Sequence, residues 1–422
     1  MAGTGVAEQT PTGVAATDVA PAELEPARSF AWSRVVAGVG ILAAAVAITA
    51  TMVLLLRSDA PSAPVVRIDP AKLLLVQPDQ HAADVPLNAP IVVQAPEARI
   101  WGVTVLDPAG HPVPGSISPD GHRWQSSALL APDTRYRVIV QASLARGLLG
   151  RDLVGRRTSF TTLRPSALLS PTITPAEGQT VGVGMPIALR FKAPIANRAA
   201  VTQALSVTPS IPVEGAWRWV NPREIHFRPR QYWPAGEHIT VVAKFAGLDA
   251  GNGVWGDADR TLHFTVGDAH VTTVDTNAHT MTVTSNGATV RTVPISAGRT
   301  KYPTMGGVHI VLYKSYDVLM DSQTVGIPRN SPDGYYEHVY WDVAISNGGE
   351  YVHAAPWSVG AQGSSNVSHG CVNLSPSDAT WYYGFSLPGD VVDVVGSPRP
   401  PSDDAGTVDW KLPWEQWVQG GQ

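Results

Sequence analysis

Residues 368–376 read SHGCVNLSP, and this stretch contains Cys371, the only cysteine in the 422-residue chain. One cysteine cannot form a disulfide within its own chain, so this thiol does not cross-link the fold. The deprotonated thiol is a strong nucleophile, and its formation requires a nearby base or positive charge. His369, two residues before the cysteine, is a first candidate for that neighbour. The stretch therefore points to nucleophilic chemistry at Cys371.

A second histidine, His353, lies sixteen residues before His369 in the stretch EYVHAAPW. If residues 350–354 form a strand, His353 can face a thiol that a neighbouring segment supplies. A histidine in that position takes the thiol proton and returns it to a leaving amine, as acyl transfer requires. Gly370 leaves room beside the sulfur, and backbone N–H groups of a tight turn there can bind an oxyanion. The side-chain amide of Asn373 can orient the substrate.

Two other roles for Cys371 are open on the residues alone. A lone cysteine is often a small buried hydrophobic residue. His353, His369 and Cys371 can also bind zinc, but their spacing matches no common structural zinc pattern and no fourth ligand is evident in the sequence. An unpaired thiol is a liability in an oxidising compartment, so its retention in an exported protein favours reactivity. We therefore predict a reactive thiol, no metal and no cofactor.

A long apolar run near the N-terminus predicts a membrane anchor. Residues 35–56 carry no charge, and Arg34 and Arg57 flank them. A helix of this length spans the roughly 30 Å hydrocarbon core, and the run is longer than the core of a cleaved signal peptide. We predict an uncleaved anchor over 35–56, a disordered cytoplasmic tail over 1–34 and a linker over 57–65. The remaining chain then lies on the extracytoplasmic side of the cell membrane; a buried core helix is the alternative.

The overall composition fits a turn-rich β protein. The chain has 39 glycines and 36 prolines, and only 15% of its residues are charged. Short strands broken by such residues are typical of sandwiches and barrels. The formal net charge is −5 and no basic cluster stands out, so we expect no nucleic-acid partner.

Two consecutive stretches resemble each other, which predicts a repeated domain. Both contain short runs of alternating apolar and polar residues between prolines and glycines, as in a β-sandwich. We predict two immunoglobulin-like domains, over 66–165 and 166–267, without the cysteine pair of antibody domains. Three pairs of segments match: VPLNAPIVVQA (85–95) with VGVGMPIALRF (181–191), APDTRYRVIVQA (131–142) with PAGEHITVVAKF (234–245), and RRTSFTT (156–162) with DRTLHFTV (259–266).

From residue 268 onward the pattern indicates a third, mostly β domain that ends near residue 397. The Asn286-Gly287 pair between alternating segments predicts a β-hairpin. Residues 376–385 begin with Pro and Ser ahead of an apolar patch and predict a short helix. The alternation in residues 390–397 predicts a closing strand.

The C-terminal extension, residues 398–422, is rich in proline and tryptophan. Trp410, Trp414 and Trp417 recur at i, i+4 and i+7, so they align on one helical face. Such a stripe packs against its own protein, and we expect it to dock on the catalytic domain.

The segment from His353 to Asn373, HAAPWSVGAQGSSNVSHGCVN, resembles the signature of the YkuD-type L,D-transpeptidases. That signature is a histidine, a spacer, then Ser/Thr-His-Gly-Cys, an apolar residue and asparagine. The order of anchor, two sandwiches, catalytic domain and Trp-rich tail also resembles the mycobacterial-type members. The implied fold is mainly β: two immunoglobulin-like β-sandwiches followed by a β-rich L,D-transpeptidase domain, with one N-terminal transmembrane helix.

The resemblance implies a reaction as well as a fold. These enzymes cross-link peptidoglycan between the third residues of two stem peptides. A cysteine attacks the diaminopimelate carbonyl of a tetrapeptide donor, releases D-Ala and forms a thioester, which the side-chain amine of a second diaminopimelate resolves. By analogy Cys371 is the nucleophile and His353 the general base, while the N–H groups of His369, Gly370 and Cys371 bind the oxyanion.

The same resemblance implies a lid over residues 320–336 and covalent inhibition by carbapenems. Two positions depart from the family pattern: Ala354 stands where relatives often have serine, and Val325 where they often have tyrosine. The residues implied to contact the substrate are Met320, Tyr335, Gly348, Gly349, Trp357 and Asn373.

Two other functions remain compatible with the residues. In an L,D-carboxypeptidase or amidase with the same Cys-His site, water rather than an amine resolves the thioester. In a non-catalytic cell-wall-binding protein, the sandwiches bind glycan and Cys371 is buried and unreactive. The intact His353, His369, Gly370 and Asn373 argue against the second alternative.

Overall fold

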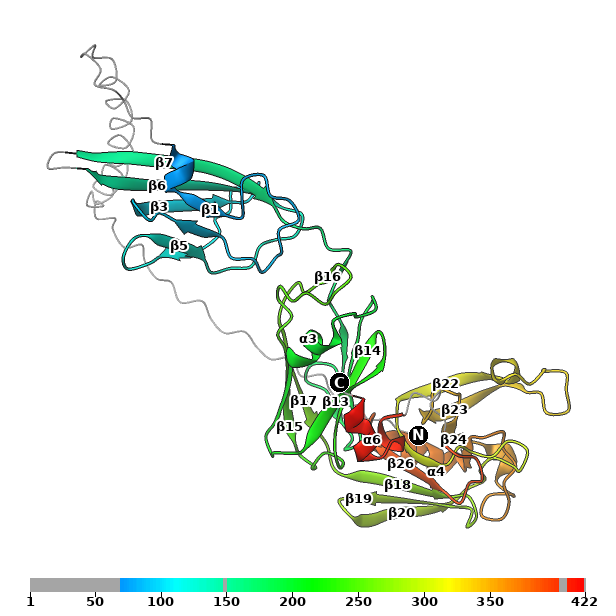
Figure 1. The fold of residues 1–422 in the computed structure, drawn as a ribbon. Coiled ribbons are helices and arrows are strands. Elements are labelled where there is room, and N and C mark those ends of the chain that lie inside the picture. Colours follow the sequence, from blue (N-terminus) through cyan, green and yellow to red (C-terminus); the bar gives the residue numbers. More distant parts are fainter. Residues whose placement is uncertain (1–68, 147–149, 402–407, 421–422) are drawn as a thin grey trace, which may run out of the picture. The chain divides into compact units, whose positions relative to one another are not determined.

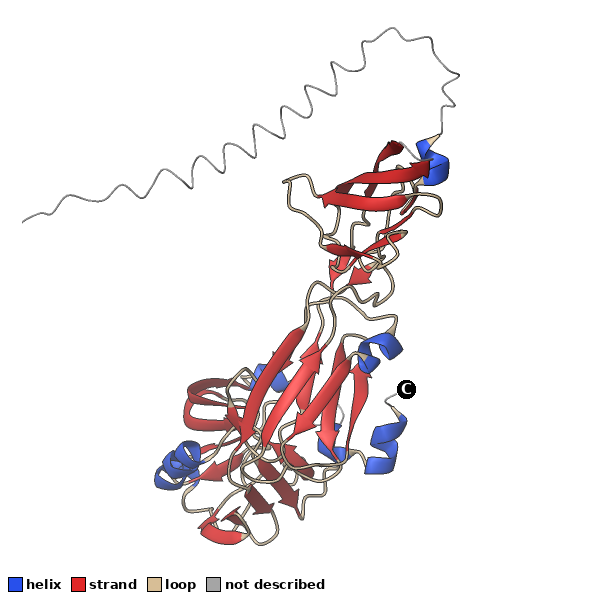
Figure 2. Ribbon diagram, turned by 90° about the vertical axis from the view of Figure 1, so that its left-hand side faces the viewer, coloured by secondary structure: helices blue, strands red, loops and turns tan. Residues whose placement is uncertain are grey.

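A computed structural model of the chain describes residues 69–146, 150–401 and 408–420. The predicted tail, membrane anchor and linker over 1–34, 35–56 and 57–65 lie outside the described residues. Within the described part, no helix has the length and apolarity needed to cross a membrane. Strands dominate this part of the chain (Figure 2).

The first repeat consists of two antiparallel sheets (Figure 1). One sheet has the order β1-β2-β5-β4 and the other β3-β6-β7. Alternation along the strands buries Trp124 and Phe160 between polar neighbours, as expected for strands with one solvated face. The elements are α2 (Pro70–Leu73), β1 (Leu75–Gln77), β2 (Val92–Gln94), β3 (Arg99–Leu106), β4 (Gly115–Ile117), β5 (Arg123–Ser126), β6 (Arg135–Arg146) and β7 (Gly150–Thr161).

The second repeat also has two four-stranded sheets, ordered β10-β17-β15-β12 and β13-β14-β11-β9, and a small β16-β8 pair. Its core includes the aromatic side chains of Trp219, Phe227, Trp233 and Phe264. The elements are β8 (Ala167–Leu168), β9 (Thr172–Thr174), β10 (Thr180–Val181), β11 (Ile187–Arg190), α3 (Arg198–Gln203), β12 (Leu205–Pro209), β13 (Gly215–Asn221), β14 (Glu224–Pro229), β15 (His238–Ala243), β16 (Val254–Trp255) and β17 (Arg260–Val266).

The third domain combines a five-stranded sheet, β20-β19-β18-β26-β21, with a four-stranded sheet, β22-β23-β24-β25. The elements are β18 (His270–Asp275), β19 (Thr280–Ser285), β20 (Ala288–Pro294), β21 (Gly307–Ile310), β22 (Tyr313–Asp321), η2 (Ser322–Val325), β23 (Tyr336–Ala344), β24 (Tyr351–Ala354), η3 (Pro356–Ser358), β25 (Val372–Leu374), α4 (Pro376–Phe385) and β26 (Val391–Val395).

Three local predictions in this domain are confirmed. Asn286 and Gly287 adopt positive φ angles of 50° and 82° in the β19–β20 hairpin, as a two-residue turn of the predicted kind requires. The predicted helix is α4, and the Ser375 hydroxyl caps it by accepting from the N–H of Asp378 at 3.2 Å. The closing strand is β26, which pairs in parallel with β18 at the centre of its sheet.

The C-terminal extension forms α5 (Val408–Lys411) and α6 (Trp414–Gln419) and docks mainly on the second repeat. The indole N–H of Trp410 donates to the Gly184 carbonyl at 2.7 Å, and that of Trp417 to the Ala216 carbonyl at 3.0 Å. Figure 1 shows α6 beside β13. The expectation that the stripe docks on the catalytic domain was therefore wrong in its main part.

The side chain of Arg228, on β14, explains why the tryptophans lie there. Its guanidinium lies 4.8, 5.3 and 4.9 Å from the ring centroids of Trp410, Trp414 and Trp417. A desolvated guanidinium over an aromatic face gains up to about 2 kcal/mol. Arg228 also donates to the Leu412 carbonyl at 2.9 Å.

The docked extension contributes a buried ion pair whose strength depends on pH. Asp409 Oδ1 lies 2.8 Å from Nδ1 of His226, and Glu224 Oε1 lies 3.0 Å from its Nε2. Burial alone would lower the pKa of His226, but the two carboxylates raise it to about 9. A histidine whose folded pKa exceeds its ordinary value of 6.5 stabilises fully below pH 6.5, and this stabilisation is lost as pH rises through 9.

We expect the melting temperature of the wild type to fall between pH 6.5 and 9.5, with a loss on the order of 3 kcal/mol in the free energy of unfolding. Asp409→Asn should lower the melting temperature at pH 6.5 and flatten this pH dependence. Glu214→Gln, which removes an exposed partner of Arg230 in the same repeat, is the matched control and should change neither. Calorimetry over this range makes the measurement; equal slopes in wild type and Asp409→Asn would refute the assignment.

Candidate active site

The parallel pairing of β24 with β25 brings the predicted catalytic residues together. Val352 pairs with Val372 and His353 with Asn373. Because side chains alternate along a strand, the two valines enter the core while His353 and Asn373 share the opposite face. Cys371, two residues before Asn373, lies on that same face. The sheet register therefore places the thiol and the imidazole on the same face of the sheet.

A pocket of about 250 Å³ opens on this face. Gly348, Gly349 and Gly370 are not part of its lining. Its lining contains seven of the predicted residues, Met320, Tyr335, His353, Trp357, His369, Cys371 and Asn373, and four that the sequence analysis did not single out, Glu337, Val339, Val367 and Ser368.

His353 is 3% exposed and held in one orientation by its neighbour. Its Nδ1 lies 2.9 Å from the carbonyl oxygen of Ala354. A carbonyl can only accept, so Nδ1 carries the proton and Nε2 of the neutral ring is left as the acceptor. Burial lowers the pKa of His353 to about 4. The imidazole is therefore neutral at pH 7, and Ala354 supplies the orienting carbonyl although it lacks the hydroxyl that relatives often have.

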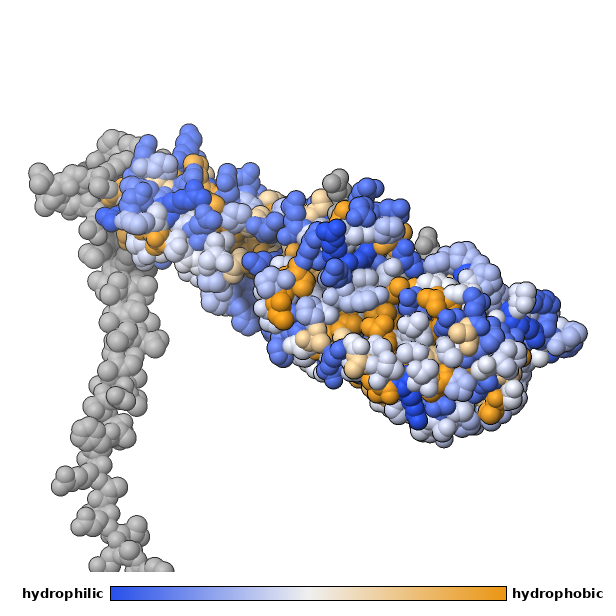
Figure 3. Space-filling model, turned by 90° about the horizontal axis from the view of Figure 1, so that it is seen from below, coloured by the Kyte–Doolittle hydropathy of each residue, from blue (hydrophilic) through white to orange (hydrophobic). Residues whose placement is uncertain are grey.

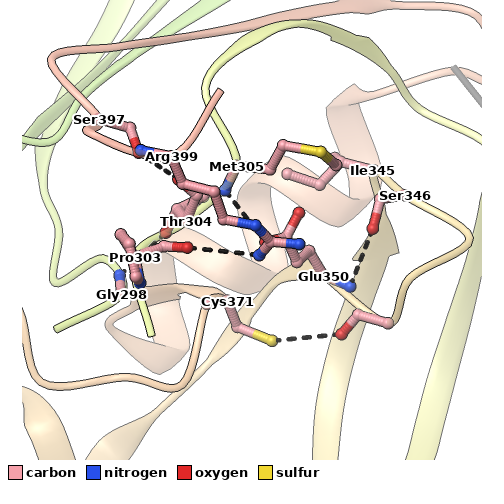
Figure 4. A network of polar contacts seen from close by, with 12 residues as sticks. Gly298, Pro303, Thr304, Met305, Ile345, Ser346, Glu350, Cys371, Ser397 and Arg399 are labelled. Atoms are coloured by element: carbon pink, nitrogen blue, oxygen red, sulfur yellow. Dashed lines mark hydrogen bonds and ion pairs between the residues drawn. The ribbon is translucent and has the colours of Figure 1, made fainter. Parts of the chain in front are cut away.

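The surroundings of Cys371 favour the protonated thiol over the thiolate. Its Sγ donates to the carbonyl oxygen of Gly349 at 3.7 Å (Figure 4). Burial raises its pKa to about 12, although the nearby N–H of Tyr351 lowers it in part. A neutral thiol beside a neutral imidazole transfers its proton as the sulfur attacks, rather than before the substrate arrives.

The turn before Cys371 is built around glycine and serine. Gly370 has a φ of +132°, which favours glycine, and an added Cβ would lie 3.3 Å from Glu350 Oε1. The Gly370 N–H donates to Ser368 Oγ at 3.1 Å, and this hydroxyl donates to the Cys371 carbonyl at 2.6 Å. The Gly370 N–H must therefore exchange its partner before it can bind an oxyanion.

His369 is held by groups other than the thiol. Arg299 donates to its Nε2 at 2.7 Å, and its ring lies 5.1 and 4.9 Å from those of Tyr302 and Tyr335. Burial, with the charge of Arg299 second, lowers the pKa of His369. Of the two histidines near the cysteine, only His353 presents a buried acceptor nitrogen on the face of the thiol.

The other pocket residues show how a substrate can be held. Asn373 is buried, and its amide donates to Ser358 Oγ at 3.0 Å. Trp357 is 55% exposed and lies 6.2 Å from the His353 ring between centroids. Burial, followed by the charges of Cys371 and Glu337, raises the pKa of Tyr335 to about 12. The Tyr335 hydroxyl therefore remains a hydrogen-bond donor at neutral pH.

The predicted lid, residues 320–336, is fastened by two carboxylates. Asp321 accepts from Nε and a terminal nitrogen of Arg329 at 2.8 and 2.6 Å. Asp333 forms ion pairs with Arg299 and Lys301 and accepts from the Tyr302 hydroxyl at 3.0 Å. The Asp321–Arg329 bonds lie within the lid, whereas the contacts of Asp333 tie the end of the lid to the loop after β20, which no local sequence pattern indicates.

An ion pair between the buried Glu350 and the exposed Arg399 was also missed. Glu350 is 5% exposed, and its Oε1 accepts from Arg399 at 2.7 Å and from the N–H of Met305 at 3.0 Å (Figure 4). Burial raises the pKa of Glu350. Arg399 comes from the segment after β26, so the contact joins parts of the chain that the sequence gives no reason to pair.

Asp342 is a buried carboxyl without a partner in the described part of the chain. It is fully buried, and neither oxygen has a hydrogen bond. A register shift between Tyr340 and Val343 leaves Trp341 and Asp342 together against the single residue His353 of the neighbouring strand. Burial, with Asp317 second, raises its pKa to about 7.

This raised pKa predicts a loss of stability with rising pH. The unfolded carboxyl ionises near pH 4, so the cost of the buried charge is absent below pH 4 and complete above pH 7, on the order of 4 kcal/mol. We expect Asp342→Asn to become more stable relative to the wild type as pH rises from 4 to 8. Asp317→Asn should keep most of the wild-type dependence of stability on pH, because burial raises the pKa of Asp342 more than the charge of Asp317 does. Denaturant titrations at both pH values test this; parallel curves for wild type and Asp342→Asn would rule it out.

A cysteine and an oriented neutral imidazole that line one pocket on a β scaffold are the elements of a thiol acyl-transfer enzyme. Residues 269–394 match the L,D-transpeptidase catalytic domain and residues 82–249 a bacterial Ig domain. L,D-transpeptidase 2 of Mycobacterium tuberculosis is 42% identical over 80% of this chain and 82% of its own length. L,D-transpeptidase 5 of the same organism is 36% identical over 83% and 77%. The chain belongs to the L,D-transpeptidase family, the acyltransferases that cross-link peptidoglycan.

Among solved structures, L,D-transpeptidase 3 from Mycobacterium tuberculosis in complex with a faropenem-derived adduct is 35% identical to this chain. The match covers 53% of this chain and 96% of that one, with a TM-score of 0.46. The family assignment rests on the sequence identity of the two relatives over most of their length and not on this structural likeness.

Proposed function

We propose that this chain forms 3–3 cross-links between diaminopimelate residues of peptidoglycan stem peptides, with Cys371 as nucleophile and His353 as general base. The observation that carries the proposal is the β24–β25 register, which puts the thiol and the free Nε2 of the imidazole on one face of the sheet, at one pocket.

In the acylation half-reaction, Sγ of Cys371 attacks the diaminopimelate carbonyl of a tetrapeptide donor. The thiol proton passes to Nε2 of His353, a C–S bond forms, and the carbonyl becomes an oxyanion. Collapse of this intermediate breaks the C–N bond, and the imidazolium returns the proton to the leaving D-Ala amine. The low pKa of His353 favours this return, because a weak base gives up its proton readily.

In the second half-reaction, the side-chain amine of a second diaminopimelate attacks the thioester. A C–N bond forms and His353 takes a proton from the attacking nitrogen. The C–S bond then breaks, and the leaving Cys371 thiolate takes that proton back from the imidazolium. The protonated hydroxyl of Tyr335 and the N–H groups of His369 and Cys371 are the proposed oxyanion donors. Met320, Trp357, Asn373 and the Gly348–Gly349 turn are the proposed substrate contacts.

The same thiol is proposed to open β-lactams of the carbapenem type. The strained amide carbonyl of the lactam takes the place of the donor carbonyl, and the ring nitrogen stays attached, so the acyl-enzyme retains the whole inhibitor. This adduct provides a mass label for the active cysteine.

We further propose the domain arrangement and location that the sequence analysis predicts. Residues 35–56 anchor the chain in the cell membrane, two immunoglobulin-like domains over 66–165 and 166–267 follow, and the catalytic domain over 268–397 acts on the extracytoplasmic side. Protease shaving of intact cells tests the location: cleavage of the body without lysis supports it, and protection of the body until lysis contradicts it.

Incubation of the full chain with a disaccharide-tetrapeptide distinguishes transpeptidation from hydrolysis. We expect dimers joined through two diaminopimelate residues, because the thioester must survive until an amine reaches it. Chromatography with mass spectrometry identifies the products. Tripeptides without dimers, over a range of acceptor concentrations, would instead assign the chain as an L,D-carboxypeptidase with the same Cys-His site.

A further inference from the structure

The outer face of the β3-β6-β7 sheet in the first repeat carries three arginines that no function described above uses. Arg135 and Arg137 alternate on β6 with the buried Tyr136 and Val138, so both point to solvent. Arg157 lies on the neighbouring strand, paired in register with Ile139. We call these three residues the arginine face. They line a hollow of about 730 Å³, the other lining residues being Gln80, Pro108, Val138, Ile139, Thr158 and Ser159.

No carboxylate of the described residues forms an ion pair with the arginine face. Within the described residues none of its three guanidiniums forms an ion pair, and Arg135 only donates to Ser159 Oγ at 3.4 Å. Three arginines of the second repeat do form ion pairs: Arg190 with Glu224 at 2.8 Å, Arg230 with Glu214 at 3.1 Å and Arg260 with Asp257 at 3.0 Å. Three like charges on adjacent strands repel each other, so their clustering without acids costs stability unless an anion binds there.

The second repeat shows that the fold does not need these arginines. The Tyr136–Phe160 pair of β6 and β7 corresponds to the Ile239–Phe264 pair of β15 and β17, and both pairs are buried. In this alignment the positions of Arg135, Arg137 and Arg157 are taken by His238, Thr240 and Thr261. The same two-stranded frame therefore forms without arginine at these three positions of its outer face.

The chemistry of the arginine face fits repeated carboxylates. A guanidinium binds a carboxylate through two parallel hydrogen bonds, and arginine is the residue best suited to this geometry. Residues two apart on a strand are separated by about 7 Å, so the face can contact several acidic groups of one polymer. The first repeat also presents a largely hydrophilic surface at the left of Figure 3, which suits a polar partner.

We propose that the arginine face binds the stem-peptide carboxylates of peptidoglycan at a site separate from the catalytic pocket. The choice of this polymer rests on the proposed function, because the diaminopimelate and terminal D-Ala residues of the substrate carry free carboxylates. Contact at a second site keeps the enzyme on the polymer between reactions, since two linked binding events raise the effective concentration of the substrate.

The test measures co-sedimentation of the full chain in detergent with purified peptidoglycan sacculi. Cys371→Ala is present in every sample, so no covalent capture contributes. The test variant carries Arg135→His, Arg137→Thr and Arg157→Thr, the residues of the second repeat. The matched control carries Arg190→Thr, Arg230→Thr and Arg260→Thr, which removes the same charge from paired arginines. Circular dichroism confirms that both variants are folded.

We expect the test variant to bind sacculi about tenfold more weakly at low salt, the sum of three modest ion pairs, and the control to bind like the parent. Added salt should reduce the difference. Sacculi whose carboxylates have been amidated should bind the parent as weakly as the test variant.

Several outcomes would overturn the proposal. Equal binding by parent and test variant, or an equal loss in the control, would remove the special role of the arginine face. The same variants are also sedimented with vesicles of phosphatidylglycerol. If the test variant loses binding to these vesicles but not to sacculi, the arginine face binds the membrane surface instead. Binding that survives amidation would exclude carboxylates as the ligand. None of these outcomes depends on catalysis, so the proposed function stands or falls separately.

Discussion

Cys371→Ala is expected to abolish covalent labelling of the chain by a carbapenem and to reduce cross-linking at least about 10³-fold. The reason is that the thiol is the only cysteine sulfur of the chain and lines the pocket in which His353 presents its acceptor nitrogen. Intact mass after incubation makes the measurement: one adduct on the wild type and none on the variant.

Two controls separate loss of the nucleophile from loss of the pocket. Cys371→Ser keeps the size of the side chain but replaces the thiol by a hydroxyl of far higher pKa, so it should also stay unlabelled. Ser365→Ala, on the exposed loop before the motif, should be labelled at the wild-type rate. An adduct on Cys371→Ala would reveal a different nucleophile. A wild type that resists both the carbapenem and small alkylating reagents would favour the non-catalytic wall-binding alternative.

His353→Gln is expected to slow acylation about 10²- to 10⁴-fold without abolishing it, because a general base contributes roughly this much. The imidazole must be neutral to accept the thiol proton, and its pKa of about 4 means that it is neutral above that pH. The wild-type acylation rate should therefore fall on the acid side with a midpoint near pH 4, and this acid limb should be missing in the variant.

The matched control is His338→Gln on the adjacent strand β23. Nδ1 of His338 lies 2.6 Å from Oδ1 of Asp317, and His338 does not line the pocket of the thiol. It should keep both the rate and the acid limb. Stopped-flow measurement of carbapenem acylation between pH 3.5 and 8 gives both quantities. If His353→Gln keeps the wild-type acylation rate, a group other than His353 is the general base. If His338→Gln loses the fall in rate at acid pH, that fall reports acid unfolding and not the titration of His353.

Local sequence patterns predicted much of the secondary structure of the catalytic domain. The Asn286-Gly287 hairpin, the helix after Ser375 and the strand after residue 390 all form where the residues indicate. These features depend on neighbours in the sequence: a pair that tolerates positive φ, a hydroxyl that caps a helix and a period of two. The spacing of His353, His369, Cys371 and Asn373 likewise predicted the kind of chemistry, through its resemblance to a family signature.

Contacts between distant segments could not be read in this way. The expected docking of the tryptophan stripe on the catalytic domain failed because Arg228 and His226, far away in the sequence, offer the cation and the ion pair that hold the extension on the second repeat. The lone carboxyl of Asp342 was likewise invisible, because its raised pKa comes from burial.

The sequence by itself determined that the one cysteine follows two histidines, His353 and His369, and predicted that a strand-rich unit repeats before the catalytic domain. Only the tertiary structure decided which histidine faces the thiol. The parallel register of β24 and β25 brings His353 to the face of Cys371, whereas Arg299, Tyr302 and Tyr335 hold His369 away from that role. The physical reason is that strand pairing and burial depend on residues far apart in the chain, while a sequence motif records only their order.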